Sequence, residues 1–249
     1  MDYRTGLKHG LPIALGYLSV SFAFGIQASV AGLPVWQAVL ISMLNVTSAG
    51  QLAGLGLMVA GAGLTEMALT QLTINLRYAL MSLALSQKLD DTVTPLHRLT
   101  ISFCNTDEVF LIAAAQPAKL SRADLYGLTN LPYLGWTLGT LLGAAAGDAL
   151  PHSVTQALGI AIYGMFLAIV VPPLRQSREI RLVVGVAVGL SCVMAWAPVF
   201  SFLTGGFRII VCAVIASALG ALLFPVTCEP EKPNGEAACE PMRNTVTHP

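Results

Sequence analysis

Eight apolar runs follow one another along the chain, separated by short polar connections. Runs of about 20 predominantly apolar residues have the length that crosses a bilayer as a helix. The alternation that a membrane β-barrel needs is absent, and helices satisfy their own backbone hydrogen bonds in lipid. The pattern therefore predicts an all-α integral membrane bundle of seven or eight transmembrane helices, some of them broken. The runs are Leu11–Ala31, Val35–Ala62, Glu66–Ser86, Leu99–Ala115, Leu125–Gly147, Val154–Val171, Leu182–Ala197 and Ile209–Val226.

The composition agrees with a membrane protein. Hydrophobic residues make up 55% of the 249 positions and charged residues 10%, with a mean hydropathy of +0.72. Soluble domains carry about 25% charged residues. The formal net charge is zero, so nothing favours nucleic acid as a partner. Because the last residues are rich in Glu and Pro, we expect a transmembrane domain over residues 1–226 and a disordered polar tail over 227–249.

Basic residues in the connections predict an orientation, because cytoplasmic loops are enriched in Lys and Arg. If all eight runs cross and both termini are cytoplasmic, Lys88 and Arg98 lie outside, beside Asp90 and Asp91. The alternative is that one of the polar-rich runs enters and leaves on the same side, which lowers the number of crossings. The basic residues predicted inside are Arg4, Lys8, Lys119, Arg122, Arg175, Arg178 and Arg181.

A polar, glycine-rich cluster occupies the middle of the second run. Asn45 and Ser48 are three residues apart and share a helix face, and Gly50 and Gln51 follow at once. Such a stretch is typical of a broken helix whose freed backbone groups point at a ligand. The alternative is a continuous helix with polar contacts to a neighbour and glycines for close approach. These four residues are candidates for substrate binding.

A second polar cluster surrounds Arg77 in the third run. Asn75 and Arg77 lie near two threonines and one glutamine, and these polar residues fall on more than one helix face, so this segment is predicted to be buried among other helices. A charge at the bilayer centre costs at least about 2.5–3.5 kcal/mol and is usually retained for function. The guanidinium fork of Arg77 suits a substrate carboxylate. The alternative is a structural pair with Asp107 or Glu108 inside the protein.

The third polar cluster is the consecutive set Asn105, Thr106, Asp107 and Glu108 in the fourth run. Four consecutive residues sweep a whole helical turn, so no orientation of a regular helix hides all of them from lipid. The helix is therefore internal or kinked here. Two adjacent carboxylates do not both ionise easily in a low dielectric, which makes Asp107 or Glu108 a candidate proton carrier. The alternative is a structural ion pair with Arg77.

Small residues recur at four-residue spacing in the fifth run, at Gly139, Gly143 and Gly147. This spacing lets helix backbones approach closely, and we favour packing within the chain over a dimer face. Leu11-Pro12 in the first run is echoed by Leu131-Pro132 in the fifth, which suggests an internal repeat of the kind that many transporters contain.

Motifs for other chemistry are missing from the sequence. It contains no zinc-protease H-E-x-x-H, no serine-hydrolase G-x-S-x-G and no phosphate-binding glycine loop followed by a lysine. The five cysteines form no C-x-x-C pair, which predicts neither a disulfide framework nor a metal site. An enzyme and a cofactor are therefore not expected, and transport would be driven by a gradient or by a separate subunit.

The polar clusters resemble those of one known family. Gly10-Leu11-Pro12, Ser48-Ala49-Gly50-Gln51, Asn75-Leu76-Arg77 and Thr106-Asp107-Glu108 are similar in order and spacing to the AzlC family, over roughly Gly6 to Phe224. That family comprises large subunits of bacterial branched-chain amino acid exporters. The chain departs from the family pattern at Asn45-Val46-Thr47, where a more apolar stretch is expected, and this affects the preference for the substrate side chain.

The resemblance implies a function and a partner. It implies export of branched-chain amino acids, and of methionine, across the bacterial cytoplasmic membrane, together with a small hydrophobic AzlD-type subunit. Arg77 would then face the substrate carboxylate, and Asp107 or Glu108 would bind the ammonium or carry a proton. The alternatives are a secondary transporter or channel for another small solute, such as a different amino acid or an organic acid, and a membrane scaffold with buried ion pairs.

Overall fold

The computed structural model describes residues 2–147, 150, 153, 160, 164, 166–167, 170–200, 202–228 and 239–241. The chain divides into two compact units, Met1–Phe166 and Leu167–Pro249. The described residues are predominantly helical, as predicted, apart from a short antiparallel ribbon of β1 (Val226–Cys228) and β2 (Cys239–Pro241). Most of the predicted disordered tail over 227–249 lies outside the described residues, and the division at residue 226 stays a prediction.

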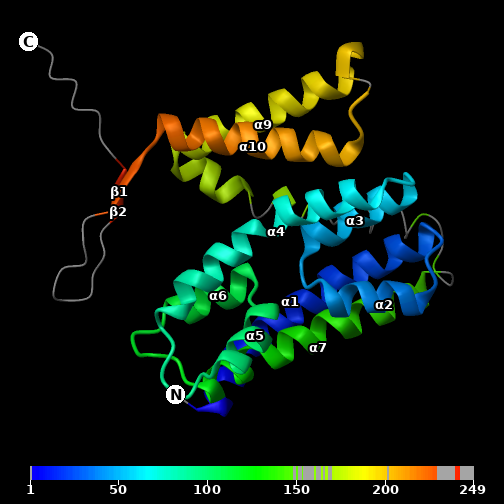
Figure 1. The fold of residues 1–249 in the computed structure, drawn as a ribbon. Coiled ribbons are helices and arrows are strands. Elements are labelled where there is room, and N and C mark those ends of the chain that lie inside the picture. The colour runs from blue at the N-terminus through cyan, green and yellow to red at the C-terminus, as the bar shows by residue number, and fades with distance from the viewer. Residues whose placement is uncertain are drawn as a thin grey trace, which may run out of the picture. The chain divides into compact units, whose positions relative to one another are not determined.

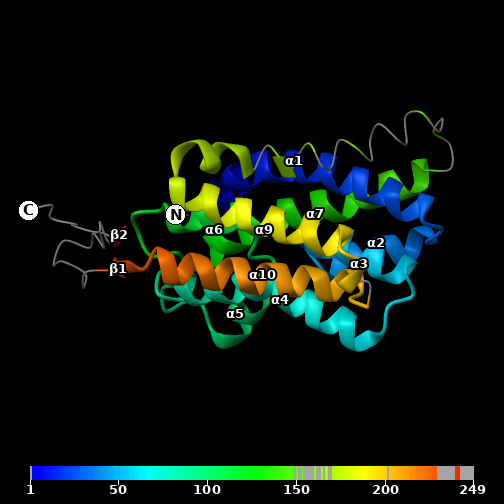
Figure 2. The same cartoon turned by 90° about the horizontal axis from the view of Figure 1, so that it is seen from above.

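The first unit is built on two long helices, α1 (Tyr3–Val30) and α7 (Arg122–Ala146), which lie side by side in Figures 1 and 2. Glycines let their backbones touch. A Cβ on Gly10 would lie 2.7 Å from the Leu128 carbonyl oxygen, and one on Gly135 would lie 2.5 Å from that of Ala14. A Cβ on Gly143 would overlap the Phe22 carbonyl. The residue numbers of the contacting pairs rise together along both helices, so the helices are parallel.

The echo of Leu-Pro pairs falls on these same two helices. Pro12 lies inside α1 and Pro132 lies inside α7. The two prolines therefore occupy corresponding places in two parallel helices. The glycine spacing at Gly139 and Gly143 serves packing within the chain, as predicted, because both residues face the α1 backbone.

A first helical hairpin consists of α2 (Val35–Leu44) and α3 (Ser48–Val59). Near the tip, Gln51 Nε2 donates a hydrogen bond to Ser42 Oγ at 2.7 Å. Farther from the tip, Ala38 and Leu55 share one buried cluster. This register is that of antiparallel helices. Helices of 10 and 12 residues are about 15 and 18 Å long, roughly half of a bilayer core.

A second helical hairpin consists of α5 (Pro95–Phe103) and α6 (Asp107–Ala114). The connections at its two ends are hydrogen-bonded to each other. The Asp90 amide donates to the Leu120 carbonyl at 3.1 Å, and the Leu120 amide donates to the Lys88 carbonyl at 2.8 Å. The chain therefore enters and leaves the second hairpin at the same end of the unit.

Helix α4 (Leu64–Ser86) connects the two hairpins and traverses the unit. Gln71 near its start contacts Gly50 of the first hairpin, and Ser82 near its end contacts Asn105 of the second. The hairpins therefore enter the first unit from opposite ends, as Figure 1 shows for α2 and α3 against α5 and α6. At 23 residues, α4 is about 35 Å long, enough to cross a bilayer core.

The prediction that all eight runs cross is therefore wrong for Val35–Ala62 and Leu99–Ala115. Each run holds enough apolar residues to cross, but polar residues at its middle end the helix and the chain turns back. The alternative of a run that enters and leaves on one side is confirmed, and it applies to two runs. In the first unit α1, α4 and α7 remain as traversing helices.

The placement of Lys88 and Arg98 away from the other basic residues is also wrong. The second hairpin returns to its starting point, so the connection that follows α4 lies beside the one that precedes α7. Apart from Arg77, the basic residues of the described first unit gather at one end, here called the basic end. They are Arg4, Lys8, Lys88, Arg98, Lys119 and Arg122.

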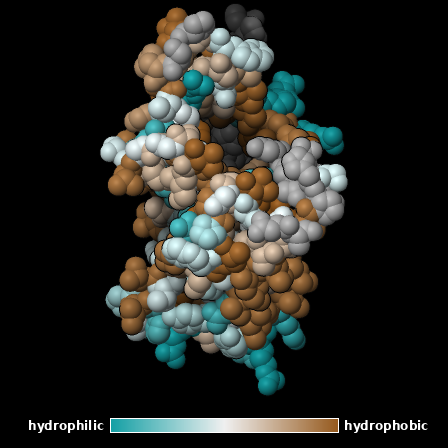
Figure 3. Space-filling view, turned by 90° about the vertical axis from the view of Figure 1, so that its right-hand side faces the viewer, coloured by the Kyte–Doolittle hydropathy of each residue, from teal (hydrophilic) through white to brown (hydrophobic). Residues whose placement is uncertain are grey.

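The second unit contains α9 (Arg178–Trp196) and α10 (Gly205–Leu223), joined through a short 3-10 turn at Pro198–Phe200. They pack antiparallel, with Cys212 Sγ 3.7 Å from Met194 Sδ. Most of their apolar side chains are exposed. Figure 3 likewise shows hydrophobic side chains over large parts of the molecular face that it presents.

Three of the described helices are long and apolar enough to span a membrane by length and composition, namely α1, α9 and α10. Helices α4 and α7 have 23 and 25 residues but carry more polar side chains. The helical membrane class is thus supported, whereas a bundle of seven or eight spans is not confirmed.

The hairpin topology predicts which loops share a side of the membrane. In a variant whose five cysteines are serine, single cysteines replacing Asp91 and Lys119 should react with a membrane-impermeant maleimide from the same side. A cysteine replacing Ala62, at the opposite end, should react only from the other side. Eight crossing helices would instead group Ala62 with Lys119, so that labelling pattern would contradict the hairpins.

The close approach of α1 and α7 predicts unequal effects of two alanine substitutions. Gly143→Ala should destabilise the protein by about 1–3 kcal/mol, because the new Cβ overlaps the Phe22 carbonyl. Gly16→Ala in α1 is the matched control, since a Cβ there meets nothing within 4 Å and removes a flexible residue from a helix. Thermal unfolding midpoints in detergent compare the two, and equal midpoints would contradict the packing.

Candidate functional site

The tip of the first hairpin is a break in the helix at Asn45-Val46-Thr47, between α2 and α3. Thr47 caps α3, its hydroxyl oxygen accepting from the Gly50 amide at 3.5 Å. Asn45 Nδ2 donates to Gln71 Oε1 at 3.3 Å, and Gln71 Nε2 donates to the Gly50 carbonyl at 2.8 Å. The predicted helix break is therefore confirmed, and α4 supplies the amide that satisfies its backbone.

Gly50 is needed for this contact with α4. A Cβ on Gly50 would lie 2.9 Å from Gln71 Oε1 and 3.3 Å from Asn45 Nδ2. Gln71 Oε1 also accepts from Asn75 Nδ2 at 3.2 Å, which adds a third predicted residue to this amide cluster. Ser48, the first residue of α3, is half-buried and makes no side-chain hydrogen bond with the described residues.

Gln51 points away from this cluster, toward α2 and α7. Its Nε2 donates to Ser42 Oγ, which lies 2.6 Å from Thr140 Oγ1 on α7. The side chain is 1% exposed, and its Oε1 has no hydrogen-bond partner among the described residues. An unpaired buried amide oxygen is costly, so a donor from a ligand or water is the natural partner.

The tip of the second hairpin is the break at Cys104-Asn105-Thr106, between α5 and α6. Thr106 caps α6 by accepting from the Val109 amide at 3.5 Å. Asn105 Nδ2 donates to Ser82 Oγ on α4 at 2.9 Å. The prediction of an internal or kinked segment at this third cluster is therefore confirmed as a broken helix.

Tyr17 of α1 holds the second tip from the other side. Its hydroxyl lies 2.5 Å from Thr106 Oγ1 and donates a hydrogen bond to the Glu108 carboxylate. The buried ring stacks edge-to-face on Trp136 of α7, with the ring centroids 5.1 Å apart. The sequence carries no signal that singles out Tyr17, because it lies alone in an apolar helix.

Arg77 joins the two tips. Its Nη1 is 2.5 Å from Asp107 Oδ2, and its Nη2 donates to the Tyr78 hydroxyl at 2.9 Å. The Tyr78 hydroxyl in turn donates to Thr47 Oγ1 at 3.1 Å. A chain of hydrogen bonds thus runs from one helix cap through Arg77 to the other hairpin. Tyr78, next to Arg77, was not among the predicted site residues.

The Arg77–Asp107 pair remains accessible. The two side chains are 47% and 45% exposed on the described chain, and Glu108 is also exposed. One arginine and two carboxylates therefore meet at the level where both helices break. The alternative of a pairing between Arg77 and a protein carboxylate is therefore confirmed, and its role in substrate binding stays a prediction. The exposure of Arg77 leaves part of the guanidinium fork available to a ligand.

A cavity of about 290 Å³ lies beside the first hairpin and is lined by residues of the amide cluster, whereas Arg77 and Asp107 are not among its lining residues. Its polar side chains are the amides of Asn45, Gln51 and Gln71, and the rest of its wall is mainly aliphatic. Among the described residues no group of three His, Cys, Asp or Glu side chains could hold a metal ion. The arrangement suits a small ligand that has one apolar part and charges of both signs.

Comparison with known proteins places the chain in a family. The model of the family described as AzlC protein matches residues 12–150, which hold all of the predicted site residues. The chain belongs to the AzlC family. The inner membrane protein YgaZ of Escherichia coli K12 is 25% identical over 226 residues, covering 88% of this chain and 91% of YgaZ.

Two uncharacterized membrane proteins of other organisms are also similar to the chain. An uncharacterized membrane protein of Archaeoglobus fulgidus is 33% identical over 191 residues, covering 76% of this chain and 84% of that protein. One from Helicobacter pylori J99 is 23% identical, covering 89% and 94%. No solved structure matches the chain. The expected family is therefore confirmed, and the relatives are membrane proteins.

The ion pair predicts coupling between Arg77 and Asp107. Arg77→Gln or Asp107→Asn alone removes one partner of the pair and leaves the other unpaired, whereas the double variant removes both charges together. The loss of unfolding free energy in the double variant should therefore be smaller than the sum of the two single losses, by at least about 0.5 kcal/mol. Unfolding midpoints of the four proteins measure this, with Lys119→Gln replacing Arg77→Gln in a control cycle. Additive effects in both cycles would argue against the pair.

Proposed function

We propose that this chain is the large membrane subunit of a secondary exporter of branched-chain amino acids, with leucine, isoleucine and valine as substrates and methionine as a further one. Export is coupled to the proton gradient, and a small hydrophobic AzlD-type subunit completes the transporter. The observation that carries the proposal is the exposed Arg77–Asp107 pair where two broken helices meet. Broken helices at mid-membrane form the substrate sites of several transporter folds.

The charges at this site match those of an amino acid. The carboxylate of the substrate pairs with Arg77 in place of Asp107, and the released Asp107 or the neighbouring Glu108 receives the ammonium or a proton. The aliphatic side chain enters the cavity beside the first hairpin, whose wall includes Leu40, Leu55 and Met67. Asn75, Asn45 and Gln51 supply neutral polar contacts.

The basic end of the first unit faces the cytoplasm in this proposal, because Lys and Arg concentrate in cytoplasmic loops. The described residues at the opposite end include Glu66 but no Lys or Arg. We therefore propose that the N-terminus of α1 lies in the cytoplasm and that the first hairpin lies on the outer side. The membrane is the bacterial inner membrane.

Loss of the Arg77 charge should abolish most export. In cells loaded with labelled leucine that also produce the small subunit, Arg77→Ala should lower efflux about ten- to a hundredfold, the worth of one charged hydrogen bond. Lys119→Ala, which removes an exposed charge at the basic end, should export normally at the same protein level.

The alternatives differ in the results they give. Normal efflux by Arg77→Ala would exclude the assigned role of Arg77. Efflux of a different solute across a substrate panel, with leucine retained, would favour a transporter for another amino acid or organic acid. If the chain were a scaffold, the wild-type protein would show no efflux. Neutralising Asp107 would then impair folding.

A further inference from the structure

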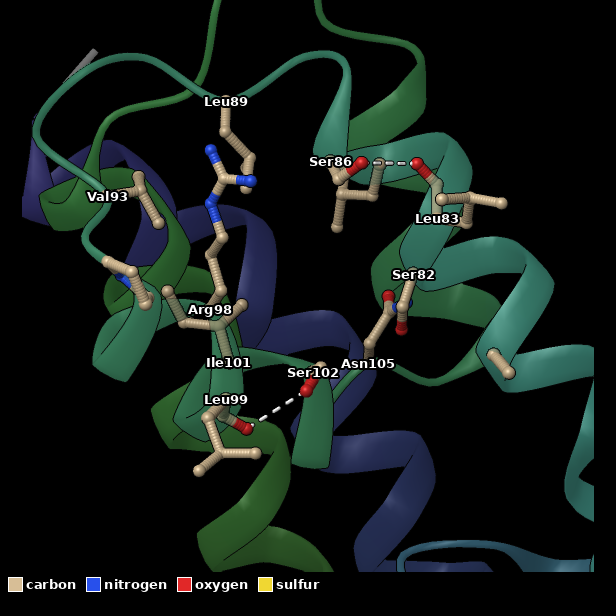
Figure 4. Close-up of a pocket in the computed structure, with 13 residues that line it drawn as sticks. Ser82, Leu83, Ser86, Leu89, Val93, Arg98, Leu99, Ile101, Ser102 and Asn105 are labelled. Atoms are coloured by element: carbon tan, nitrogen blue, oxygen red, sulfur yellow. Dashed lines mark hydrogen bonds between the residues drawn. The ribbon is translucent and has the colours of Figure 1, made fainter.

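The second hairpin borders a cavity that the Arg77 site does not use. It has a volume of about 430 Å³ and lies between α4 and α5, as Figure 4 shows. Its walls are largely aliphatic, with Leu83, Leu85 and Ile101 among the lining residues. Small-molecule sites commonly have volumes of about 300–1,000 Å³, so the cavity has room for an amino acid.

A single cation lines this cavity among the described residues. Arg98 is exposed, and its guanidinium makes no ion pair or side-chain hydrogen bond with any described residue. Its side chain extends from α5 toward Leu89 in Figure 4. An arginine stays protonated and offers a planar fork that binds a carboxylate through two hydrogen bonds. The cavity therefore has a place for an anionic group.

The cavity also has a buried acceptor that lacks a donor. Asn105 is 3% exposed and lines the wall, and its Nδ2 is used by Ser82. Its Oδ1 has no hydrogen-bond partner among the described residues. The hydroxyls of Ser86 and Ser102 are directed to the backbone carbonyls of Leu83 and Leu99, as the dashed lines in Figure 4 indicate. The Asn105 oxygen is therefore an acceptor without a donor, and because it is itself buried the Asn105 amide must shift before a ligand can reach it.

We propose that this cavity is a second binding site for a small aliphatic amino acid, on the basic side of the Arg77–Asp107 pair. Arg98 binds the carboxylate, Asn105 Oδ1 accepts a hydrogen bond from the ammonium, and the hydrocarbon chain lies against Leu83 and Ile101. Figure 4 shows Arg98 and Asn105 on different sides of the cavity, so the exposed arginine turns inward on binding.

The two cavities of the first unit have the same construction, which supports a shared ligand class. Each lies between α4 and one hairpin, includes the asparagine of the hairpin tip, and contains one buried amide oxygen without a partner, Gln51 Oε1 or Asn105 Oδ1. Along α4 the first cavity is lined by Gln71 and the second by Ala79, with Arg77 between them. A solute passing along α4 would meet them in series.

A lipid chain is the less suitable occupant. The acyl chain of a lipid would cover the aliphatic wall but would leave the Asn105 oxygen without a donor. An amino acid satisfies the wall, the oxygen and Arg98 together. The choice of an amino acid as the ligand rests on the proposed function. The cavity and its unpaired groups are observed independently of that function.

Equilibrium binding of labelled leucine to the purified chain in detergent tests the second site. The wild type should bind two leucines per chain. Arg98→Gln should weaken one of them about ten- to a hundredfold, and Leu83→Trp, which fills the cavity at an exposed position, should remove the same one. Lys119→Gln is the matched control, because it removes a charge from the basic end without touching the cavity, and it should bind two.

Competitors identify the groups that are recognised. At the site lost in Arg98→Gln, 4-methylpentanoate should compete better than 3-methylbutylamine, because only the former carries the carboxylate. Wild-type binding by both Arg98→Gln and Leu83→Trp would overturn the second site. Displacement by a lysophospholipid but not by 4-methylpentanoate would overturn it in favour of lipid. Neither result depends on efflux by Arg77→Ala, so this proposal and the proposed function can fail separately.

Discussion

Both hairpin tips are hydrogen-bonded to the same helix, α4, and the site depends on this arrangement. A helix that breaks inside a membrane leaves backbone groups that lipid cannot satisfy. The hydroxyls of Thr47 and Thr106 cap the two new helix starts. Helix α4 then supplies Gln71 to the first tip and Ser82 to the second. The polar residues of α4 are therefore structural partners of the breaks as well as candidates for binding.

The ion pair between Arg77 and Asp107 is better suited to exchange than to stabilisation. Half-exposed pairs that face a water-filled pathway contribute about 0–1 kcal/mol, because water screens them and holding the side chains costs entropy. The Arg77 and Asp107 side chains are 47% and 45% exposed. A pair of such low worth can open at little cost when a ligand offers a carboxylate to Arg77. A fully buried pair would resist the same exchange far more strongly.

The sequence identified the polar clusters but not their arrangement. Asn45, Arg77 and Asp107 were predictable, because polar groups in apolar runs must be buried or functional. The reversal of the chain at Thr47 and Thr106 was not predictable, since hydropathy counts apolar residues and does not report whether the chain continues across the membrane or turns back. The error on Lys88 and Arg98 followed from counting the second hairpin as a crossing. Tyr17 could not be predicted, because only the fold brings it to Glu108.

The two hairpins change the expected topology without changing the sides of the termini. Each hairpin takes the place of one expected crossing and does not itself cross. Two fewer crossings leave the total even, so both termini stay on the same side. With the basic end in the cytoplasm, the described helices α1, α4 and α7 give three crossings, and α7 ends on the outer side. The runs Val154–Val171, Leu182–Ala197 and Ile209–Val226 then predict three more crossings and a cytoplasmic C-terminus, although the first of them falls largely outside the described residues. In this arrangement Lys88 and Arg98 join Arg175, Arg178 and Arg181 inside. Arg208, in the first turn of α10, lies outside in this topology and in the eight-crossing one alike. The corrected topology therefore satisfies the charge bias better than eight crossings do, because it removes the two basic residues that an eight-crossing chain must place outside.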